Sequence, residues 1–220
     1  MASRKLEILI DANSLSHLSR IEINRQKTDK WLWKYLQVMT CKSVRDEFFT
    51  KVNERTSTER SIWKKIDKTK SSVISVKRII ALEKKWLSQD YYKKSLKKKD
   101  EGERHLICAA VEVVKDKIFS QMVIVSDDFT ARNYFMDKVL EDIQFGQIWN
   151  TPDLLSYLFL IHDDISYENA ENAMIDLIAI ESMSWRKFKD KYDTQQDAMI
   201  KMRGYYIKKL QKINSLKQKY

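Results

Sequence analysis

LEILIDANS, residues 6–14, is the stretch that decides the fold we expect. Its first five residues form a mostly apolar run with β-branched side chains, and the run ends at Asp11. A short run of this kind is typical of a strand that is buried on both faces of a sheet. A second run, Met122–Val125, is followed at once by Ser126, Asp127 and Asp128. The sequence therefore predicts two buried strands that each lead directly into carboxylates.

Outward from these two runs, strand and helix patterns alternate as far as residue 161. The expected strands are 6–10, 37–40, 72–76, 122–125 and 147–149, and the expected helices are 13–21, 29–36, 43–52, 56–68, 79–87, 103–114, 130–140 and 153–161. Alternation of this kind predicts an α/β fold in three layers (α/β/α), in which helices cover both faces of a mostly parallel central sheet.

The last quarter of the chain has no strand pattern and predicts two or three helices. An apolar stripe runs along it, formed by Met199, Met202, Tyr206, Leu210 and Ile213. We therefore expect two units, an α/β domain over residues 1–162 and a basic helical extension over residues 163–220. The stripe indicates that the extension packs on something: its own domain, a second copy in a homodimer, or an inhibitory protein partner.

Composition favours a polyanionic partner. The 220 residues carry a formal net charge of +10 and include only 3 glycines and 1 proline. Such a charge favours nucleic acid first and an anionic membrane surface second. Cys41 and Cys108 lie in apolar surroundings, so we expect buried thiols in a reducing cytoplasm. The longest apolar run, 154–161, is too short to span a bilayer, so no membrane association is expected.

The acids that carry the chemistry follow the strands or lie at predicted helices. In parallel sheets ligands bind just outside the carboxyl ends of the strands, so Asp11 and the pair Asp127 and Asp128 should share one crevice. Further acids at or near helices are Glu47, Asp100, Glu101 and Glu103. Each has a structural alternative, because strand-end aspartates often cap helices and acids in a first turn complement the helix dipole.

Carboxylates that converge repel one another in a cleft of low dielectric constant, and a divalent cation removes that cost. Sites made only of oxygen ligands favour hard ions such as Mg²⁺ or Mn²⁺. Such an ion can bind a phosphodiester oxygen, lower the pKa of a bound water and stabilise the leaving oxygen. The joint placement of the acids therefore predicts a Mg²⁺ or Mn²⁺ site that acts on phosphodiesters.

Five stretches, in this order, resemble the motifs of the PIN-domain ribonucleases, a family that includes the VapC toxins. They are ILIDANSL (8–15), SVRDEF (43–48), DEGERHLICAA (100–110), VIVSDDFTARN (123–133) and IWNTPDLLSYL (148–158). The resemblance covers roughly residues 5–161. It implies a PIN-like α/β/α domain, a Mg²⁺ or Mn²⁺ site and cleavage of RNA. The chain departs from a minimal toxin in an added helical region, 54–70, and in its C-terminal extension.

The resemblance also implies roles for individual residues. The catalytic acids would be Asp11, Glu47, Glu103 and Asp128, and the metal ligands would be Asp11, Glu103 and Asp128, with Asp127 as a competitor for the last position and Asp100 as an accessory. Ser14 and Ser126 would orient carboxylate or phosphate from outside the metal's own ligands.

Basic residues near the acids are candidates for holding nucleic acid. Lys93, Lys94, Lys97 and Lys98 precede the acidic helix, and Arg104 and Arg132 are candidates for a place near the scissile phosphate. The lysines are equally compatible with a solvated loop, and either arginine with a structural salt bridge. The three histidines have no partner at ligand spacing along the sequence, so we predict no histidine-based metal site.

The reading that fits best is a metal-dependent endoribonuclease, acting as a toxin or an antiviral-defence effector. A DNA nuclease remains an alternative, because it uses the same metal chemistry. A catalytically inactive PIN-like module that binds nucleic acid or protein should lack some acids, yet all the expected positions are occupied. A phosphatase with Asp11 as nucleophile usually needs a second aspartate two residues on, where this chain has Asn13.

Overall fold

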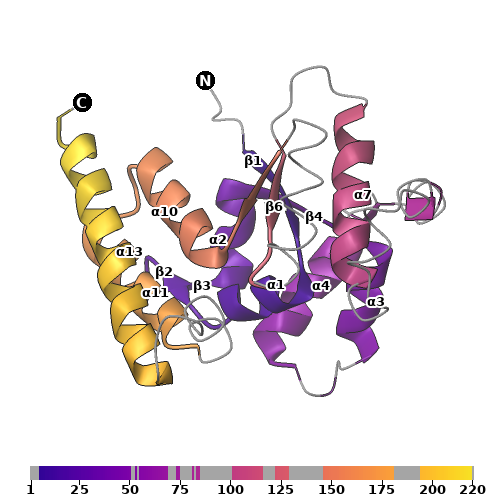
Figure 1. Ribbon diagram of the computed structural model, residues 1–220, viewed down its shortest axis with the longest axis horizontal. Helices are drawn as coiled ribbons and strands as arrows, with labels where there is room; N and C mark the ends of the chain where they lie inside the picture. The colour runs from indigo at the N-terminus through magenta and orange to yellow at the C-terminus, as the bar shows by residue number, and fades with distance from the viewer. Residues whose placement is uncertain are drawn as a thin grey trace.

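The computed structural model describes residues 5–50, 53, 55–68, 73–74, 81, 83–84, 101–115, 122–128, 146–180 and 194–219. Its centre is a parallel sheet of five strands in the order β5-β4-β1-β6-β7. Figure 1 shows three of these strands, β1, β4 and β6, among the helices. The strands are β1 (Leu6–Ile10), β4 (Leu36–Cys41), β5 (Val73–Ile74), β6 (Val123–Val125) and β7 (Gln147–Trp149). All five expected strands are present, and the expectation of an α/β fold with a parallel sheet is confirmed.

Strand β1 lies in the middle of the sheet. Leu6 pairs with Leu36 of β4 on one side, and Ile10 pairs with Val125 of β6 on the other. The chain therefore builds outward from β1 through β4 to β5, and then returns to the other side for β6 and β7. The order of the strands reverses between β1 and β6, which makes that boundary the topological switch point of the sheet.

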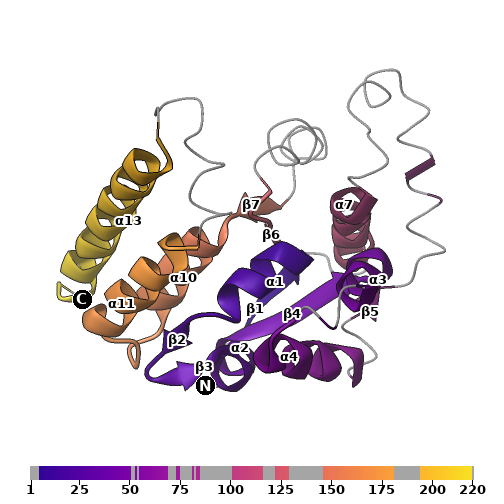
Figure 2. The same ribbon diagram turned by 90° about the horizontal axis from the view of Figure 1, so that it is seen from below.

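Helices cover both faces of this sheet. Ile8, Leu9 and Ile10 are all fully buried, and because successive side chains point to opposite faces, neither face is open to water. Helix α2 (Thr28–Tyr35) packs against β4 and α4 (Ser57–Lys68), whereas α7 (Glu101–Lys115) packs against β1, β4 and β6. In Figure 2, β4 runs between α2 and α4 on one side and α7 on the other, consistent with three layers.

Local capping chemistry determines where the helices that follow the strands begin. Helix α1 (Ala12–Leu18) starts one residue earlier than expected because Asp11 itself is the N-cap, accepting from the N–H of Ser14. Helix α3 (Lys42–Thr50) starts one residue before the expected helix 43–52. Helix α10 (Thr151–Ile161) opens with a capping box between Asn150 and Asp153.

A short hairpin between α1 and α2 was not expected. It pairs β2 (Glu22–Ile23) with β3 (Gln26–Lys27) through Asn24 and Arg25, whose φ angles are 54° and 59°. Both turn residues adopt the left-handed conformation that two-residue hairpin turns require. The strands are too short and too polar to produce an alternating pattern, so only the tolerance of asparagine for positive φ signals the turn.

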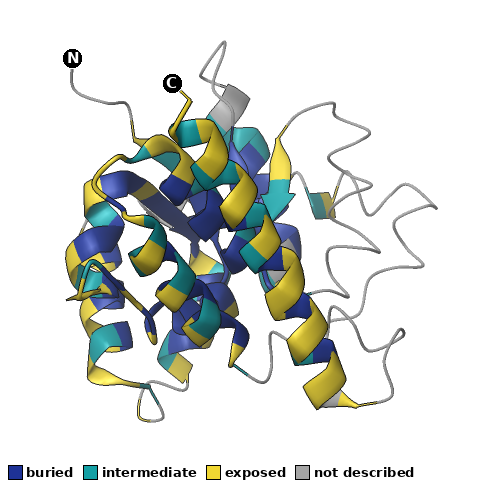
Figure 3. Cartoon of the chain, turned by 90° about the vertical axis from the view of Figure 1, so that its left-hand side faces the viewer, coloured by how far each residue is buried: buried dark blue, intermediate teal, exposed yellow. Residues whose placement is uncertain are grey.

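The C-terminal helices pack against α10 and share the main core. Helices α11 (Tyr167–Ile178) and α13 (Gln195–Lys217) both contact α10 and each other. The predicted stripe is confirmed in part: Met202, Tyr206 and Leu210 are buried, whereas Met199 and Ile213 are half-buried. The Asn150 amide donates to the Tyr206 hydroxyl at 2.8 Å. Figure 3 shows α13 lying on the outside of the molecule; the division of the chain at residue 162 stays a prediction.

Two expected elements cannot be compared. The helix predicted at 130–140 lies outside the described residues, and that at 79–87 is described only at residues 81, 83 and 84. Across the ranges described, no helix combines the length and apolarity needed to cross a bilayer. Cys41 and Cys108 are buried free thiols, as expected.

Candidate functional site

The candidate site lies where β1 and β6 end, at the switch point. The N–H of Asp11 donates to the carbonyl of Val125 at 3.1 Å, and the N–H of Ser126 donates to the carbonyl of Trp149 at 2.9 Å. These bonds continue the sheet pairing one residue beyond the strands. They bring Asp11 alongside Ser126, Asp127 and Asp128, as their positions after adjacent parallel strands predict.

Asp11 is a buried acid that is only half satisfied. Asp11 is 4% exposed, and its Oδ1 accepts a hydrogen bond from the N–H of Ser14 at 2.5 Å. Within the described part of the chain, its Oδ2 is buried and has no hydrogen-bond partner. Burial, and then the charge of Asp127, raise the pKa of Asp11 to about 6, although the nearby Ser126 and Ser14 partly offset the rise.

Asp127, in contrast, is held from several directions. His17 Nδ1 donates to its Oδ2 at 2.7 Å. The Thr151 N–H donates to its Oδ1, and the Thr151 hydroxyl donates to its Oδ2, both at 2.9 Å. Both carboxylate oxygens therefore already accept hydrogen bonds from α1 and α10. Asp127 ties these two helices to the end of β6.

Asp128 is more accessible than its neighbour. The residue is half-buried, and its N–H donates to the hydroxyl of Ser126 at 3.2 Å. The hydroxyl of Ser14 similarly accepts from the N–H of Asp127 at 2.9 Å. The two fully buried serines thus orient the backbone of the paired acids, and the role predicted for them toward a carboxylate or phosphate stays a prediction.

Glu47 lies on α3 beside the start of α7. It is exposed, and its Oε2 lies 3.3 Å from the position that a Cβ atom on Gly102 would occupy. The absence of a side chain at Gly102 therefore leaves room for this carboxylate. The side chain of Glu103, the next residue along α7, lies outside the described parts of the structure.

Asp11 fits a role as ligand of a hard cation. Its buried Oδ2 lacks a donor, and its raised pKa reports a carboxylate group whose negative charge is poorly compensated. Both features would be relieved by a divalent ion bound to oxygen. Among the described side chains, no group of three or more histidines, cysteines or acids is placed to hold a metal. The expected ligands Glu103 and Asp100 are not among those side chains.

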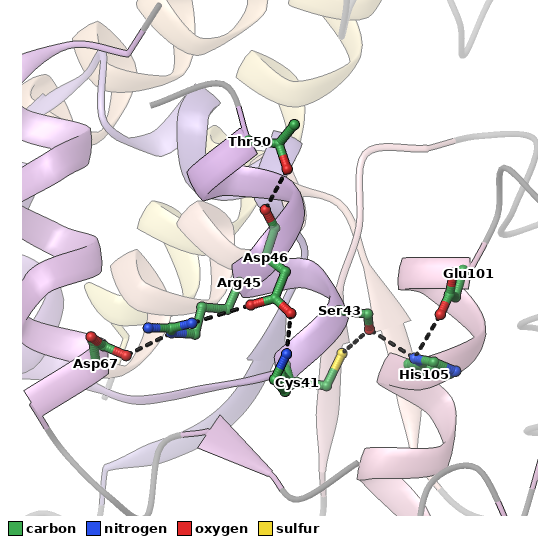
Figure 4. Close-up of polar contacts among 9 residues, drawn as sticks. Cys41, Ser43, Arg45, Asp46, Thr50, Asp67, Glu101 and His105 are labelled. Atoms are coloured by element: carbon green, nitrogen blue, oxygen red, sulfur yellow. Dashed lines mark hydrogen bonds and ion pairs between the residues drawn. The ribbon is translucent and has the colours of Figure 1, made fainter. Parts of the chain in front are cut away.

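A second polar cluster lies between α3 and α7. Arg104 Nε donates to Glu83 Oε1 at 2.7 Å, and His105 Nε2 donates to Glu83 Oε2 at 3.1 Å. Ser43 lies between Cys41 and His105, and Glu101 faces the same imidazole (Figure 4). Although burial raises the pKa of Glu83, hydrogen bonds from Arg104 and His105 outweigh it and lower that pKa. Arg104 thus forms the salt bridge that was the alternative to a phosphate contact.

Two contributors to the acid site were missed at the level of sequence. His17 has no partner at ligand spacing along the sequence, and Thr151 was not among the expected site residues. Asp127 lies 110 residues from the first and 24 from the second. No local spacing can reveal such pairings. The signal available was that Thr151 directly precedes Pro152, at the start of the helix that follows the strand next to β6.

The other predicted nucleic-acid contacts and one metal ligand cannot be placed. Lys93, Lys94, Lys97, Lys98, Asp100 and Arg132 lie outside the described residues. The roles predicted for them stay predictions.

Comparison of the chain with protein-family models, with curated proteins and with solved structures found no match.

Proposed function

We propose that this protein is a metal-dependent endoribonuclease with a PIN-like domain. The observation that carries the proposal is the buried Oδ2 of Asp11, which has no partner among the described residues and lies beside a second acid at the switch point of a parallel sheet. Structural acids are normally satisfied by hydrogen bonds or paired with cations. A buried carboxylate oxygen that has neither is a candidate for a functional site.

Three further observations support the proposal. The strand order puts the ends of β1 and β6 at the position where open α/β sheets bind ligands. The available ligands are carboxylates, which suit Mg²⁺ or Mn²⁺. The net charge of +10 suits a polyanionic substrate. The choice of RNA over DNA rests on the resemblance to PIN-domain ribonucleases.

The residues divide into ligands and positioning groups. Asp11, through its Oδ2, and Asp128, through its accessible carboxylate, would hold the ion together with Glu103, and Glu47 would approach from α3. The bound ion would supply Lewis acidity and a water of lowered pKa. Asp127 is a positioning residue, because His17 and Thr151 already occupy its oxygens and its negative charge acts on Asp11 from a fixed place.

The test compares cleavage of single-stranded RNA in Mg²⁺ or Mn²⁺ by the wild type and by four single variants. Asp11→Asn and Asp128→Asn should each lose about 10³-fold in rate or more, equivalent to about 4 kcal/mol of transition-state stabilisation. Asp127→Asn keeps an acceptor for Thr151 and should stay within about tenfold of the wild type. Asp163→Asn, whose side chain is fully exposed, is the matched control and should change nothing.

Each contrary outcome has a distinct meaning. Equal cleavage by the wild type and Asp11→Asn would remove the assigned site. Cleavage of DNA in preference to RNA would keep the site and change the substrate. Binding of RNA with no cleavage in either metal would leave a PIN-like binding module.

A further inference from the structure

Helix α13 presents two different faces. Met202, Tyr206 and Leu210 are buried against the rest of the protein. Lys201, Lys208 and Lys212 are exposed. Intervals of seven and four residues return to nearly the same side of a helix, so these three lysines form one line. Lys219, also exposed, follows just past the helix end at a further interval of seven. We name Lys201, Lys208, Lys212 and Lys219 the lysine line.

The charge on this helix is not balanced locally. From Ala198 to Lys219 the sequence has seven lysines and arginines and no acid. Two of the seven are turned inward: Lys209 pairs with Asp153 at 3.0 Å, and Lys217 donates to the carbonyls of Phe159 and His162. The side chains of the four residues in the lysine line form no hydrogen bond or ion pair with the described residues. Their charges face solvent along about 27 Å of helix axis.

We propose that the lysine line binds the phosphate backbone of RNA, outside the acid site. The identity of the polyanion as RNA rests on the proposed function. Lysines act as point charges that hold phosphates without reading bases, so the surface would add affinity rather than sequence preference. Tyr205, 56% exposed and on the same side of α13, offers an aromatic face on which a base can stack.

The arrangement favours RNA over an anionic membrane surface. A helix that lies in a membrane interface buries a continuous apolar face among the lipids. The apolar face of α13 is already packed against its own protein. Its exposed apolar residues Ile200 and Leu216 lie near opposite ends of the helix and form no continuous face.

The experiment measures binding in the absence of cleavage. A labelled single-stranded RNA of mixed sequence and about 20 nucleotides is titrated with the full-length protein in a metal chelator, by fluorescence anisotropy at several salt concentrations. One variant replaces all four residues of the lysine line by glutamine. The matched control replaces Lys27, Lys30, Lys64 and Lys68 by glutamine. These lysines are exposed on β3, α2 and α4, so their replacement removes the same amount of charge. Circular dichroism establishes that both variants fold.

The lysine-line variant should bind about tenfold more weakly or worse at 0.1 M salt. The slope of log K against log salt should become shallower by about 2 to 3, since each single-strand phosphate contact contributes about 0.7. The control should change the slope by less than one such contact. Equal losses in both variants, or no loss in either, would overturn the proposal. So would lysine-line-dependent binding to phosphatidylcholine vesicles with about 30% phosphatidylserine and none to RNA.

Failure of this proposal and failure of the proposed function are separable. Binding that needs the lysine line, without cleavage in Mg²⁺ or Mn²⁺, refutes only the nuclease. Cleavage that needs Asp11, with RNA binding unchanged by the lysine-line variant, refutes only the lysine line.

Discussion

Two polar clusters in this protein differ in whether the charge of the central acid is compensated by its neighbours. At the switch point, Asp11 lies beside Asp127, and one Asp11 oxygen has no donor among the described residues. Between α3 and α7, Glu83 accepts from both Arg104 and His105. The pKa of Asp11 is raised to about 6, whereas that of Glu83 is lowered.

The difference separates an acid whose charge is compensated by neighbouring residues from an acid that we propose binds a cation. Burial opposes ionisation at both positions, so burial alone does not distinguish them. What distinguishes them is the nearest charge, which is a cation for Glu83 and another carboxylate for Asp11. A cluster that stays uncompensated after folding stores free energy that a bound cation can release.

The largest effect that tests this comparison is on pH and metal dependence. The folded protein holds the proton of Asp11 more tightly than the unfolded chain, whose ordinary pKa is 3.8. Stability from this group is therefore greatest at or below pH 4 and falls as pH rises through about 6, by roughly 3 kcal/mol. Mg²⁺ should recover much of this loss at pH 7.5 and little at pH 5. Urea unfolding at stepped pH, with and without Mg²⁺, measures both.

Asp11→Asn isolates that contribution. In this variant the free energy of unfolding should no longer fall between pH 4 and 6, and Mg²⁺ should no longer raise it at pH 7.5. The stability contributed by Glu83 changes with pH in the opposite direction. Because its pKa is lowered, this stability is present above the ordinary pKa of 4.5 and is lost as pH falls. If Mg²⁺ stabilised the wild type and Asp11→Asn equally, the ion would not be bound by Asp11.

A smaller effect is expected from breaking the compensated cluster. Arg104→Met should cost about 2 kcal/mol in the free energy of unfolding, because it leaves the Glu83 carboxylate without its main partner. Adding Glu83→Gln should restore most of this, since the unpaired charge is then gone. Arg45→Met breaks the more exposed pair with Asp67 and should cost less than about 1 kcal/mol. If Arg104→Met instead lowered cleavage at unchanged stability, Arg104 would be assigned to a contact with the substrate phosphate.

The smallest effect concerns Glu47 and its place beside α7. Gly102→Ala puts a Cβ atom 3.3 Å from Glu47 Oε2, so that carboxylate must shift slightly. Helix propensity should raise stability by about 0.5 kcal/mol while cleavage falls several-fold. Gly204→Ala, with no atom within 4 Å of the new Cβ, should stabilise α13 without changing cleavage. Unchanged cleavage by Gly102→Ala would show that Glu47 takes no part in the reaction.

The strands, and the meeting of Asp11 with Asp127 and Asp128, could be predicted from the sequence. Buried parallel strands are near-continuous apolar runs. Residues 6–10, apart from Glu7, and residues 123–125 are such runs with an acid close behind. Adjacency then follows from topology, because carboxyl ends of parallel strands lie at one edge. The short polar hairpin at Glu22–Lys27 carries no such pattern and was missed.

Partnerships between side chains were beyond prediction. Nothing near His17 in the sequence points to Asp127, and nothing near Arg104 selects Glu83 over the other acids. Such pairs depend on how elements pack rather than on local periodicity. For the same reason, the hydrogen bonds that hold Asp127, from His17 and Thr151, could not be predicted from the sequence around it.

The turn at Asn24 has a consequence for how the protein is made. Its side-chain amide donates to the carbonyl of Asp164 at 2.8 Å and accepts from Asn169 at 2.9 Å, across 140 and 145 residues. On the ribosome the hairpin emerges before Asp164 and Asn169, which are synthesised on the order of 10 seconds later. The nascent hairpin therefore lacks both hydrogen bonds of the Asn24 side chain until residues 164–169 have been synthesised.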